Sequence, residues 1–275
     1  MSTVSRETAR EHRVTVPSLA RRKQRGEPIS MLTAYDFAFA RIFDGAGIDV
    51  LLVGDSLGNV VQGQATTLPV TLDETVYHTR LVSRGAARAL VVADLPFSSF
   101  QISAEDGLRS SVRCIKEGGA HAVKLEGGTA VAATIERIVA AGIPVMGHVG
   151  LTPQAIHRMG GHRVQGRSEA GARRVLEDAR AVQAAGAFAV VLEGMPAELA
   201  KEITAELAIP TIGIGAGADC DGQVLVMHDM LGLSEWTPSF VKAYANLGTL
   251  ASQAARRFAE EVGQRKFPDE EHSYR

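Results

Sequence analysis

The chain has 275 residues, of which 45% are hydrophobic, and its mean hydropathy is +0.04. This length suits one barrel of alternating strands and helices, which takes roughly 250 residues. The net charge of -2 and the pI of about 6.5 exclude the basic surface of a nucleic-acid binder, and no apolar run has the length of a membrane span. Cys114 and Cys220 have no second Cys or His at metal-ligand spacing. We therefore expect a soluble cytoplasmic protein that binds neither nucleic acid nor membrane.

The amino-terminal region is polar and mixed in sign up to residue 13, and a short basic run follows at residues 21–25. This pattern predicts a mobile arm followed by a surface helix that starts at Pro17-Ser18 and ends at Gly26. Arm and helix together would occupy about residues 1–28.

Short apolar runs alternate with segments of helical length from Ile29 onward. Runs of this length and composition indicate strands that are buried on both faces, as in a parallel sheet. Glycines at the ends of the helical segments and small hydroxyl residues at their starts mark the boundaries. The predicted strands span residues 29–33, 50–53, 89–93, 122–125, 144–148, 187–192, 211–214 and 224–227.

Eight such repeats predict a (β/α)8 TIM barrel, and a doubly wound open sheet is the alternative that periodicity does not separate from it. Residues 213–222 leave no room for a full helix between the last two predicted strands. A long helix over residues 240–262 and a polar tail over residues 268–275 follow. Because no linker splits the chain, we expect one barrel domain over residues 1–275, with a carboxyl-terminal helical extension from about 238 to 275.

Charged or polar side chains end five consecutive predicted strands, from the second to the sixth. The carboxyl ends of barrel strands share one face, so these side chains should converge at one mouth. Each alone could cap a turn or form a structural ion pair. Burying so many charges without partners is costly, which favours a functional cluster. Its members are Asp55, Ser56, Asp94, Lys124, Glu126, His148 and Glu193.

The residue types in this cluster indicate its chemistry. Asp55, Asp94 and Glu126 offer hard oxygen ligands, which suit Mg²⁺ better than zinc. Lys124 and Glu126 share one face of their strand, because side chains alternate with a period of two. Lys124 could neutralise an anionic substrate or form a Schiff base, and Glu193 could accept a proton from another part of the mouth.

A glycine-rich segment, Gly213-Ile214-Gly215-Ala216-Gly217, contains the end of the seventh predicted strand, after which barrels often bind phosphate. It holds no Lys, Arg, Ser or Thr, and its spacing differs from that of the dinucleotide-binding fingerprint. Close backbone packing or contact with a flat ligand is therefore favoured over phosphate binding.

Several motifs, taken in order and at their spacing, resemble the ketopantoate hydroxymethyltransferase family. The resemblance runs from about Val14 to the tail Glu270-Glu271-His272-Ser273, with departures in the amino-terminal arm and at residues 234–238. The motifs are Ala34-Tyr35-Asp36, Val53-Gly54-Asp55-Ser56-Leu57-Gly58, Thr67-Leu68-Pro69-Val70-Thr71, Ala93-Asp94-Leu95-Pro96-Phe97, Val123-Lys124-Leu125-Glu126-Gly127-Gly128, Gly147-His148-Val149-Gly150-Leu151-Thr152-Pro153-Gln154, Gly160-Gly161 with Val164-Gln165-Gly166-Arg167, and Ile212-Gly213-Ile214-Gly215-Ala216-Gly217.

The resemblance implies a Mg²⁺-dependent barrel that makes 2-dehydropantoate (ketopantoate) for pantothenate and coenzyme A. A hydroxymethyl group would pass from 5,10-methylenetetrahydrofolate to 3-methyl-2-oxobutanoate through a Mg-stabilised enolate, releasing tetrahydrofolate. It also implies a homodecamer of two stacked rings. By position, Asp55 and Asp94 would bind the metal and touch the oxoacid, Glu126 would be a third metal ligand, directly or through water, Ser56 and Lys124 would contact the oxoacid, and Glu193 would accept the proton.

Two alternatives remain at this point. One is another Mg-dependent carbon-carbon lyase or mutase that acts on a 2-oxoacid. The other is a non-catalytic α/β ligand-binding protein, which needs no base at Glu193. His148 is a further candidate site residue without an assigned role.

Overall fold

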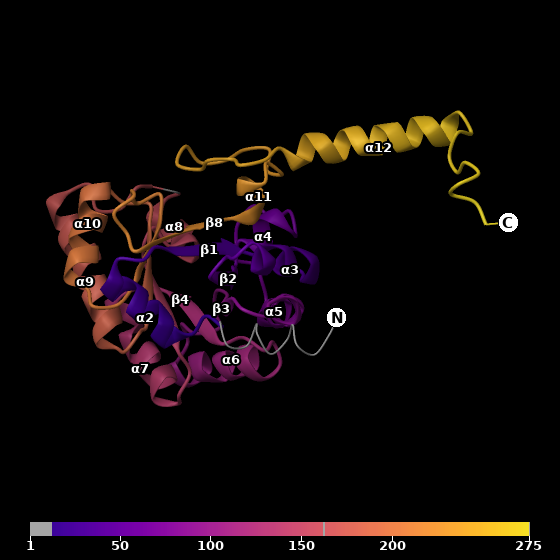
Figure 1. Cartoon of the computed structure of the whole chain (residues 1–275). Coiled ribbons are helices and arrows are strands. Elements are labelled where there is room, and N and C mark those ends of the chain that lie inside the picture. The colour runs from indigo at the N-terminus through magenta and orange to yellow at the C-terminus, as the bar shows by residue number, and fades with distance from the viewer. Residues whose placement is uncertain (1–12, 162, 275) are drawn as a thin grey trace. The chain divides into compact units, whose positions relative to one another are not determined.

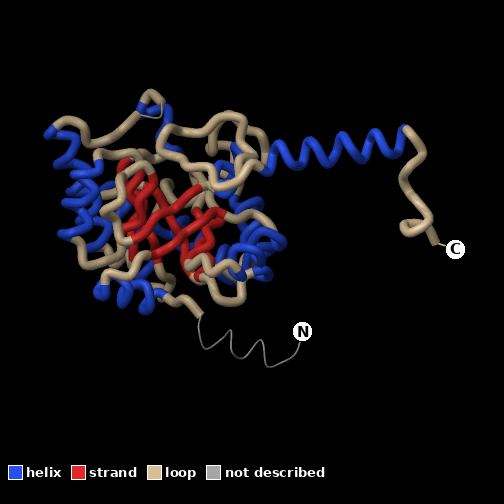
Figure 2. Tube along the Cα trace, turned by 45° about the horizontal axis from the view of Figure 1, so that its top comes forward, coloured by secondary structure: helices blue, strands red, loops and turns tan. Residues whose placement is uncertain are grey.

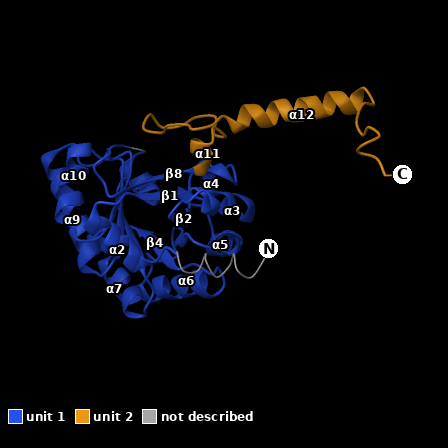
Figure 3. Cartoon of the chain, in the orientation of Figure 1, with its two compact units in different colours: residues 1–226 blue, residues 227–275 orange. Residues whose placement is uncertain are grey.

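The computed structural model describes residues 13–161 and 163–274, so the predicted arm up to residue 12 lies outside the described residues. The chain forms two compact units, Met1–Val226 and Met227–Arg275 (Figure 3). The second unit begins at Met227, whereas we expected an extension from about residue 238. The division into arm, barrel and extension otherwise stays a prediction.

The first unit is a (β/α)8 barrel, as predicted. Its strands are parallel, and each pairs with its neighbours in sequence until β8 pairs with β1 and closes the ring. This closure excludes the open sheet. β1, β2 and β7 have the predicted bounds, β4 is longer by one residue, and the other strands differ by one or two residues at both ends. The strands are β1 (Ile29–Thr33), β2 (Val50–Val53), β3 (Leu90–Asp94), β4 (Ala122–Glu126), β5 (Val145–Gly150), β6 (Ala189–Glu193), β7 (Thr211–Ile214) and β8 (Gly222–Leu225).

Helices surround the strands (Figures 1 and 2). Small hydroxyl residues begin three of them, as the sequence pattern predicts. Thr71 and Glu74 form a capping box at α5, and the hydroxyls of Ser103 and Ser168 accept backbone N–H bonds at α6 and α9. No helix of the described residues lies between β7 and β8, as expected. The helical segments are α2 (Val16–Arg25), α3 (Phe37–Gly45), α4 (Leu57–Val60), α5 (Leu72–Gly85), α6 (Ala104–Lys116), η1 (Thr129–Val131), α7 (Ala132–Ala140), η2 (Pro153–Ala155), α8 (Ile156–Met159), α9 (Glu169–Ala184) and α10 (Ala197–Glu206).

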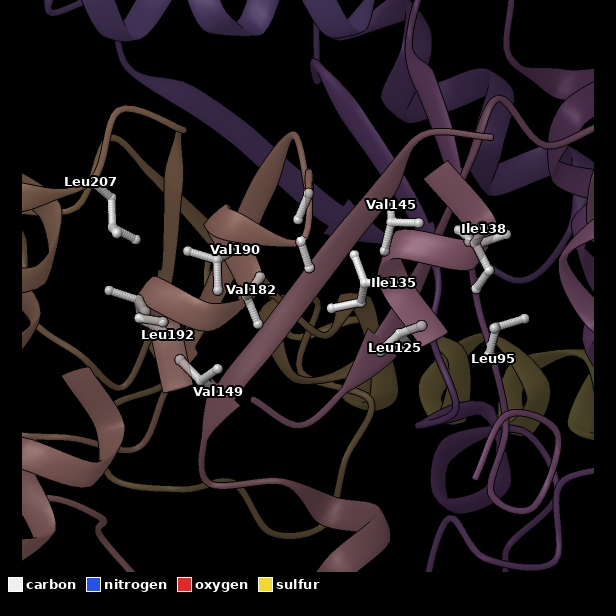
Figure 4. Close-up of a cluster of buried hydrophobic side chains, with 14 of the residues drawn as sticks. Leu95, Leu125, Ile135, Ile138, Val145, Val149, Val182, Val190, Leu192 and Leu207 are labelled. Carbon is white, nitrogen blue, oxygen red and sulfur yellow. The ribbon is translucent and has the colours of Figure 1, made fainter. Parts of the chain in front are cut away.

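The core has two layers because alternate strand residues point to opposite faces of the sheet. Outward residues such as Leu125 and Val149 pack with Ile135 of α7 and Val182 of α9 (Figure 4). Inward residues such as Met146 fill the barrel itself. The barrel is therefore a packed core and not a pore.

Helix α2 packs across the amino-terminal end of the barrel. Its Thr15 side chain and a left-handed Gly26 cap its two ends, which confirms the predicted helix. Leu19 is 1% exposed and packs with the inward strand residues. Arg22 and Lys23, in its last turn, pair with acids that precede β2 and β8. A hydrophobic anchor and flanking ion pairs thus hold α2 in place.

The second unit contains α11 (Met227–Met230) and α12 (Leu247–Gly263). The predicted helix over residues 240–262 was wrong at its start, since α12 begins at Leu247. Backbone bonds from Tyr244 and Leu247 to carbonyls of Met230 and Leu231 hold the preceding segment out of a helix. The Asn246 side chain then caps α12. Within the described chain, no helix is both long and apolar enough to cross a membrane.

Candidate active site

The predicted site residues all line one cavity of about 140 Å³ at the carboxyl ends of the strands. Asp55 and Ser56 follow β2. The last residues of β3, β4 and β6 are Asp94, Glu126 and Glu193, and two residues before the ends of β4 and β5 lie Lys124 and His148. The cavity therefore brings together every residue that the sequence proposed: Asp55, Ser56, Asp94, Lys124, Glu126, His148 and Glu193.

The inward direction of these side chains follows from strand alternation. Ala122 lies in the core inside the barrel, so Lys124 and Glu126, two and four residues later, point inward as well. Strand register places Asp94 beside Lys124 and Glu126 beside His148. Neighbouring strands thus bring titratable side chains to adjacent positions, and in the case of Asp94 and Lys124 these carry opposite charges.

Lys124 and Asp94 form a buried ion pair. The Lys124 Nζ donates to both carboxylate oxygens of Asp94 at 2.7 Å, and the two side chains are 4% and 2% exposed. Burial alone would lower the pKa of Lys124, but the nearby carboxylates, Asp94 first among them, outweigh burial and raise the pKa. The ammonium is therefore charged at neutral pH, deep in a cavity where an anionic substrate would find few other cations.

Gln154 is a site residue that sequence reasoning missed. Its side-chain N–H group donates to Asp55 Oδ2 at 3.1 Å and to the Leu95 carbonyl at 2.9 Å. Its backbone N–H donates to Glu126 Oε2 at 3.0 Å. One residue on the loop after β5 thus fixes carboxylates from two other strands. The motif that ends in Gln154 was visible in sequence, but its partners were not.

Tyr35 was also missed. Its hydroxyl lies 2.8 Å from the hydroxyl of Ser56, so the two share a hydrogen bond. Tyr35 follows β1 and is 2% exposed. Its place two residues after the end of β1 was the signal that could have identified it.

Glu126, His148 and Glu193 form a second group of titratable side chains in the lining of the cavity. His148 Nε2 lies 3.1 Å from Glu193 Oε2, and His148 Nδ1 lies 3.6 Å from Glu126 Oε1. Neither contact has hydrogen-bond geometry, and these ring nitrogens and Glu126 Oε1 are buried without a hydrogen-bond partner among the described residues. Such atoms are costly unless a ligand or ion completes them.

Burial shapes the protonation of this group. It raises the pKa of Glu126 well above its ordinary value, with the Asp55 carboxylate acting in the same direction. Burial and the charge of Lys124 lower the pKa of His148, so the imidazole is neutral at pH 7. Glu193 is 17% exposed at its side chain and is the most accessible of the three to the cavity.

The carboxylates fit a hard divalent cation by their chemistry. Oxygen donors from Asp55, Asp94 and Glu126 face one cavity, and Glu126 Oε1 has no hydrogen bond within the described chain. However, no group of three His, Cys, Asp or Glu side chains in residues 13–161 and 163–274 is already gathered for a metal. The metal ligands stay a prediction.

The glycine-rich segment packs tightly, as expected. A Cβ on Gly213 would lie 2.9 Å from Cys220 Sγ, and one on Gly217 would lie 2.5 Å from the Cβ of Ala197. Gly217 also has a φ of 82°, which side chains disfavour. Ile214 points from this segment into the cavity.

The chain is similar to known proteins over nearly its whole length. A family model described as ketopantoate hydroxymethyltransferase matches residues 13–270. The 3-methyl-2-oxobutanoate hydroxymethyltransferases of Pelobacter propionicus and Moorella thermoacetica are each 57% identical to this chain. The first match covers 95% of this chain and 97% of the relative, and the second covers 97% and 100%. A phosphonopyruvate hydrolase in complex with oxalate and Mg²⁺ is 13% identical, with a TM-score of 0.58 over 94% of this chain and 92% of the other, and shares the fold.

Proposed function

Because the chain belongs to the ketopantoate hydroxymethyltransferase family, we propose that this enzyme transfers a hydroxymethyl group from 5,10-methylenetetrahydrofolate to 3-methyl-2-oxobutanoate. The products are 2-dehydropantoate and tetrahydrofolate. One observation carries the proposal: Glu193 borders the same small cavity as the buried Lys124–Asp94 pair. A proton acceptor thus shares a small cavity with a fixed positive charge.

The oxoacid binds with its charged end toward β2 to β4. The Lys124 ammonium attracts the carboxylate and keto oxygens, and the Ser56 hydroxyl, oriented by Tyr35, is a further hydrogen-bond donor. The cavity of about 140 Å³ suits a small branched acid and excludes a folate from its floor. The folate therefore approaches from the open side of the mouth.

Mg²⁺ is the proposed metal, held by Asp55 and Asp94 with Glu126 as a third ligand, directly or through water. When bound, it supplies positive charge beside the keto oxygen, where negative charge grows as the neighbouring C–H bond breaks. The hard oxygen donors and the hydrogen-bond-free Glu126 Oε1 support this assignment. Gln154 holds two of these carboxylates in place.

Glu193 is the proposed proton acceptor. It removes the proton from C3 of the oxoacid, and the resulting carbon nucleophile attacks the one-carbon unit of the folate. A carbon–carbon bond and a bond to the oxygen of water form, and both bonds from the one-carbon unit to the folate nitrogens break. The C3 proton and one proton of water balance the two nitrogens, which become the N–H groups of tetrahydrofolate. The neutral His148 beside Glu193 leaves that carboxylate without a competing positive charge.

Three further proposals rest on the family resemblance. The reaction serves pantothenate and coenzyme A biosynthesis, the protein acts in the cytoplasm, and it assembles as a homodecamer. Light scattering tests the last of these, since a decamer of 29.2 kDa chains is easily distinguished from a monomer.

Proton NMR tests the proposed reaction in two steps. In deuterated water with Mg²⁺ and no folate, the enzyme should remove the C3 proton signal of 3-methyl-2-oxobutanoate. With the folate donor added, 2-dehydropantoate should form. Exchange without this product would favour another lyase or mutase of 2-oxoacids, and absence of both would overturn the proposal.

A further inference from the structure

The wall of the site cavity has a charged side and an apolar side. The charged side comes from β2 to β6 and ends at Glu193. The next strands around the ring, β7 and β8, contribute Ile214 and Val224, followed by Leu225 and Val226. The site therefore changes from ionic to hydrocarbon character between β6 and β7.

The boundary between the two sides lies at a single register pair. Glu193, the last residue of β6, pairs with Ile214, the last residue of β7. Both line the cavity. A substrate carbon that faces Glu193 thus has Ile214 on one side and the charged strands on the other.

The floor beneath this boundary is apolar and closed. Leu52, Val191 and Val224 line the cavity and also belong to the core inside the barrel, where they are 6%, 2% and 5% exposed. Packing at interior density leaves them little freedom to move aside. An alkyl group that enters here cannot displace the floor, so its size is limited by the side wall.

The substrate's own structure orients it against this wall. C3 of the oxoacid carries both the proton to be removed and two methyl groups. If that proton points at Glu193 while the oxygens face Lys124, the methyl groups must lie toward β7 and β8. Burial of these methyl groups against Ile214 and Val224 is also favoured by the hydrophobic effect.

We propose that Ile214, seated on the floor formed by Val191 and Val224, determines the largest alkyl group that the enzyme accepts at C3 of a 2-oxoacid. This inference rests on the proposed function and adds a specificity-determining residue to it. The wild-type enzyme should prefer 3-methyl-2-oxobutanoate over 3-methyl-2-oxopentanoate, which carries one more methylene. Shortening Ile214 by one methylene should make room for it.

The experiment compares C3 proton exchange of these two acids, without folate, in wild-type enzyme and in the Ile214→Val variant. The ratio of kcat/KM for the larger acid to that for the smaller should rise about tenfold, the lower end of the effect of one methylene in a tight pocket. The rise should come mainly from a lower KM for the larger acid. Ile214→Ala should move the ratio further in the same direction.

Ile212→Val is the matched control. Ile212 lies two residues earlier on β7, points into the same barrel interior and is 1% exposed, but it does not line the cavity. This variant should keep the wild-type ratio. A shift as large as that of Ile214→Val would show a general loosening of the barrel and would overturn the assignment.

The outcomes separate the inference from the function on which it rests. If wild-type enzyme exchanges the proton of 3-methyl-2-oxobutanoate but Ile214→Val leaves the ratio unchanged, the inference fails and the proposed function stands. If wild-type enzyme exchanges neither acid, both fail. If the ratio rises only in the Ile214 variants, the apolar side of the cavity is the size filter.

Discussion

The two ends of the barrel treat buried carboxylates in opposite ways. At the amino-terminal end, Asp49 accepts hydrogen bonds from the backbone and hydroxyl of Ser30 at 3.0 and 2.9 Å and pairs with Arg22 at 2.6 Å and Arg88 at 3.2 Å. Burial raises its pKa, but the hydrogen bonds from Ser30 and the contact with Arg22 outweigh burial and lower the pKa. At the carboxyl-terminal end, burial raises the pKa of Asp94 to about 7, even beside Lys124.

A second acid confirms the pattern at the amino-terminal end. Asp221 accepts bonds from Lys23 at 2.7 Å and from the backbone and hydroxyl of Thr211 at 2.8 and 3.0 Å. The carboxyl-terminal end instead leaves Glu126 Oε1 and both His148 nitrogens buried without hydrogen bonds in the described residues. At one end the protein itself supplies the hydrogen-bond partners, and at the other it leaves buried polar atoms without them, which is typical of a functional site.

The largest expected effect is at Glu193. Glu193→Gln should fold and yet lose about 10²- to 10⁴-fold in turnover, because the amide cannot accept a proton. Loss of the C3 proton signal of the oxoacid, followed by NMR, measures this directly. Thermal unfolding on the same sample should change little, as expected for the end of the barrel that serves chemistry.

Two results would count against that role. Exchange at the wild-type rate would show that Glu193 is not the base for C3. A drop in thermal stability as large as the drop in activity would make Glu193 a structural partner of a charged group in the cavity such as Lys124, and the contrast between the two ends would disappear.

The next largest effect is at the amino-terminal end of the barrel, and it is on stability rather than on activity. Asp49→Asn should lower the free energy of unfolding by roughly 3 kcal/mol, because the partly buried Arg22 and Arg88 lose the negative charge with which they pair. Urea unfolding measures the loss, while kcat per folded molecule should stay at the wild-type value. A catalytic defect with normal stability would contradict this assignment.

The stability difference at Asp49 should also depend on pH. The folded-state pKa lies below the unfolded value near 3.8, so the carboxylate stabilises the fold above that pH. Its contribution is lost as pH falls through the folded pKa. The gap between wild type and Asp49→Asn should therefore be constant from about pH 5 to 8 and shrink below about pH 4.

The smallest expected effect is a gain. Glu126→Gln should raise the unfolding free energy of the metal-free protein by about 1 kcal/mol, because the amide avoids the cost of a buried charge. Activity with Mg²⁺ should fall sharply at the same time. A loss of stability would instead mean that Glu126 is as well satisfied as Asp49.

The fold and the charged site could be predicted from sequence because both depend on local sequence patterns. These patterns are the alternation of side chains along a strand and the alternation of strands with helices along the chain. Strand alternation predicts that Lys124 and Glu126 point the same way, and barrel geometry brings Asp94 and His148 beside them. Buried strands such as β2 have little choice of structure, so their bounds were predictable. The family motifs then supplied roles that residue types alone left open.

The parts that were missed depend on contacts between distant residues. Gln154 bonds Asp55 across 99 positions in sequence and Leu95 across 59. No local pattern encodes such contacts. The prediction of where α12 starts was wrong for the same reason, because backbone hydrogen bonds to the carbonyls of Met230 and Leu231 override the helical pattern before Leu247.

The packed barrel interior and the helix across its base make the site a blind-ended well. In the proposed reaction the small oxoacid lies at the bottom and the much larger folate lies above it. Each reactant must then enter and leave through the same opening, so binding and release are ordered. The oxoacid binds first, and tetrahydrofolate departs before 2-dehydropantoate. A saturating folate donor should consequently trap bound oxoacid and slow its escape, so that the order of events at this enzyme is set by the floor of its well.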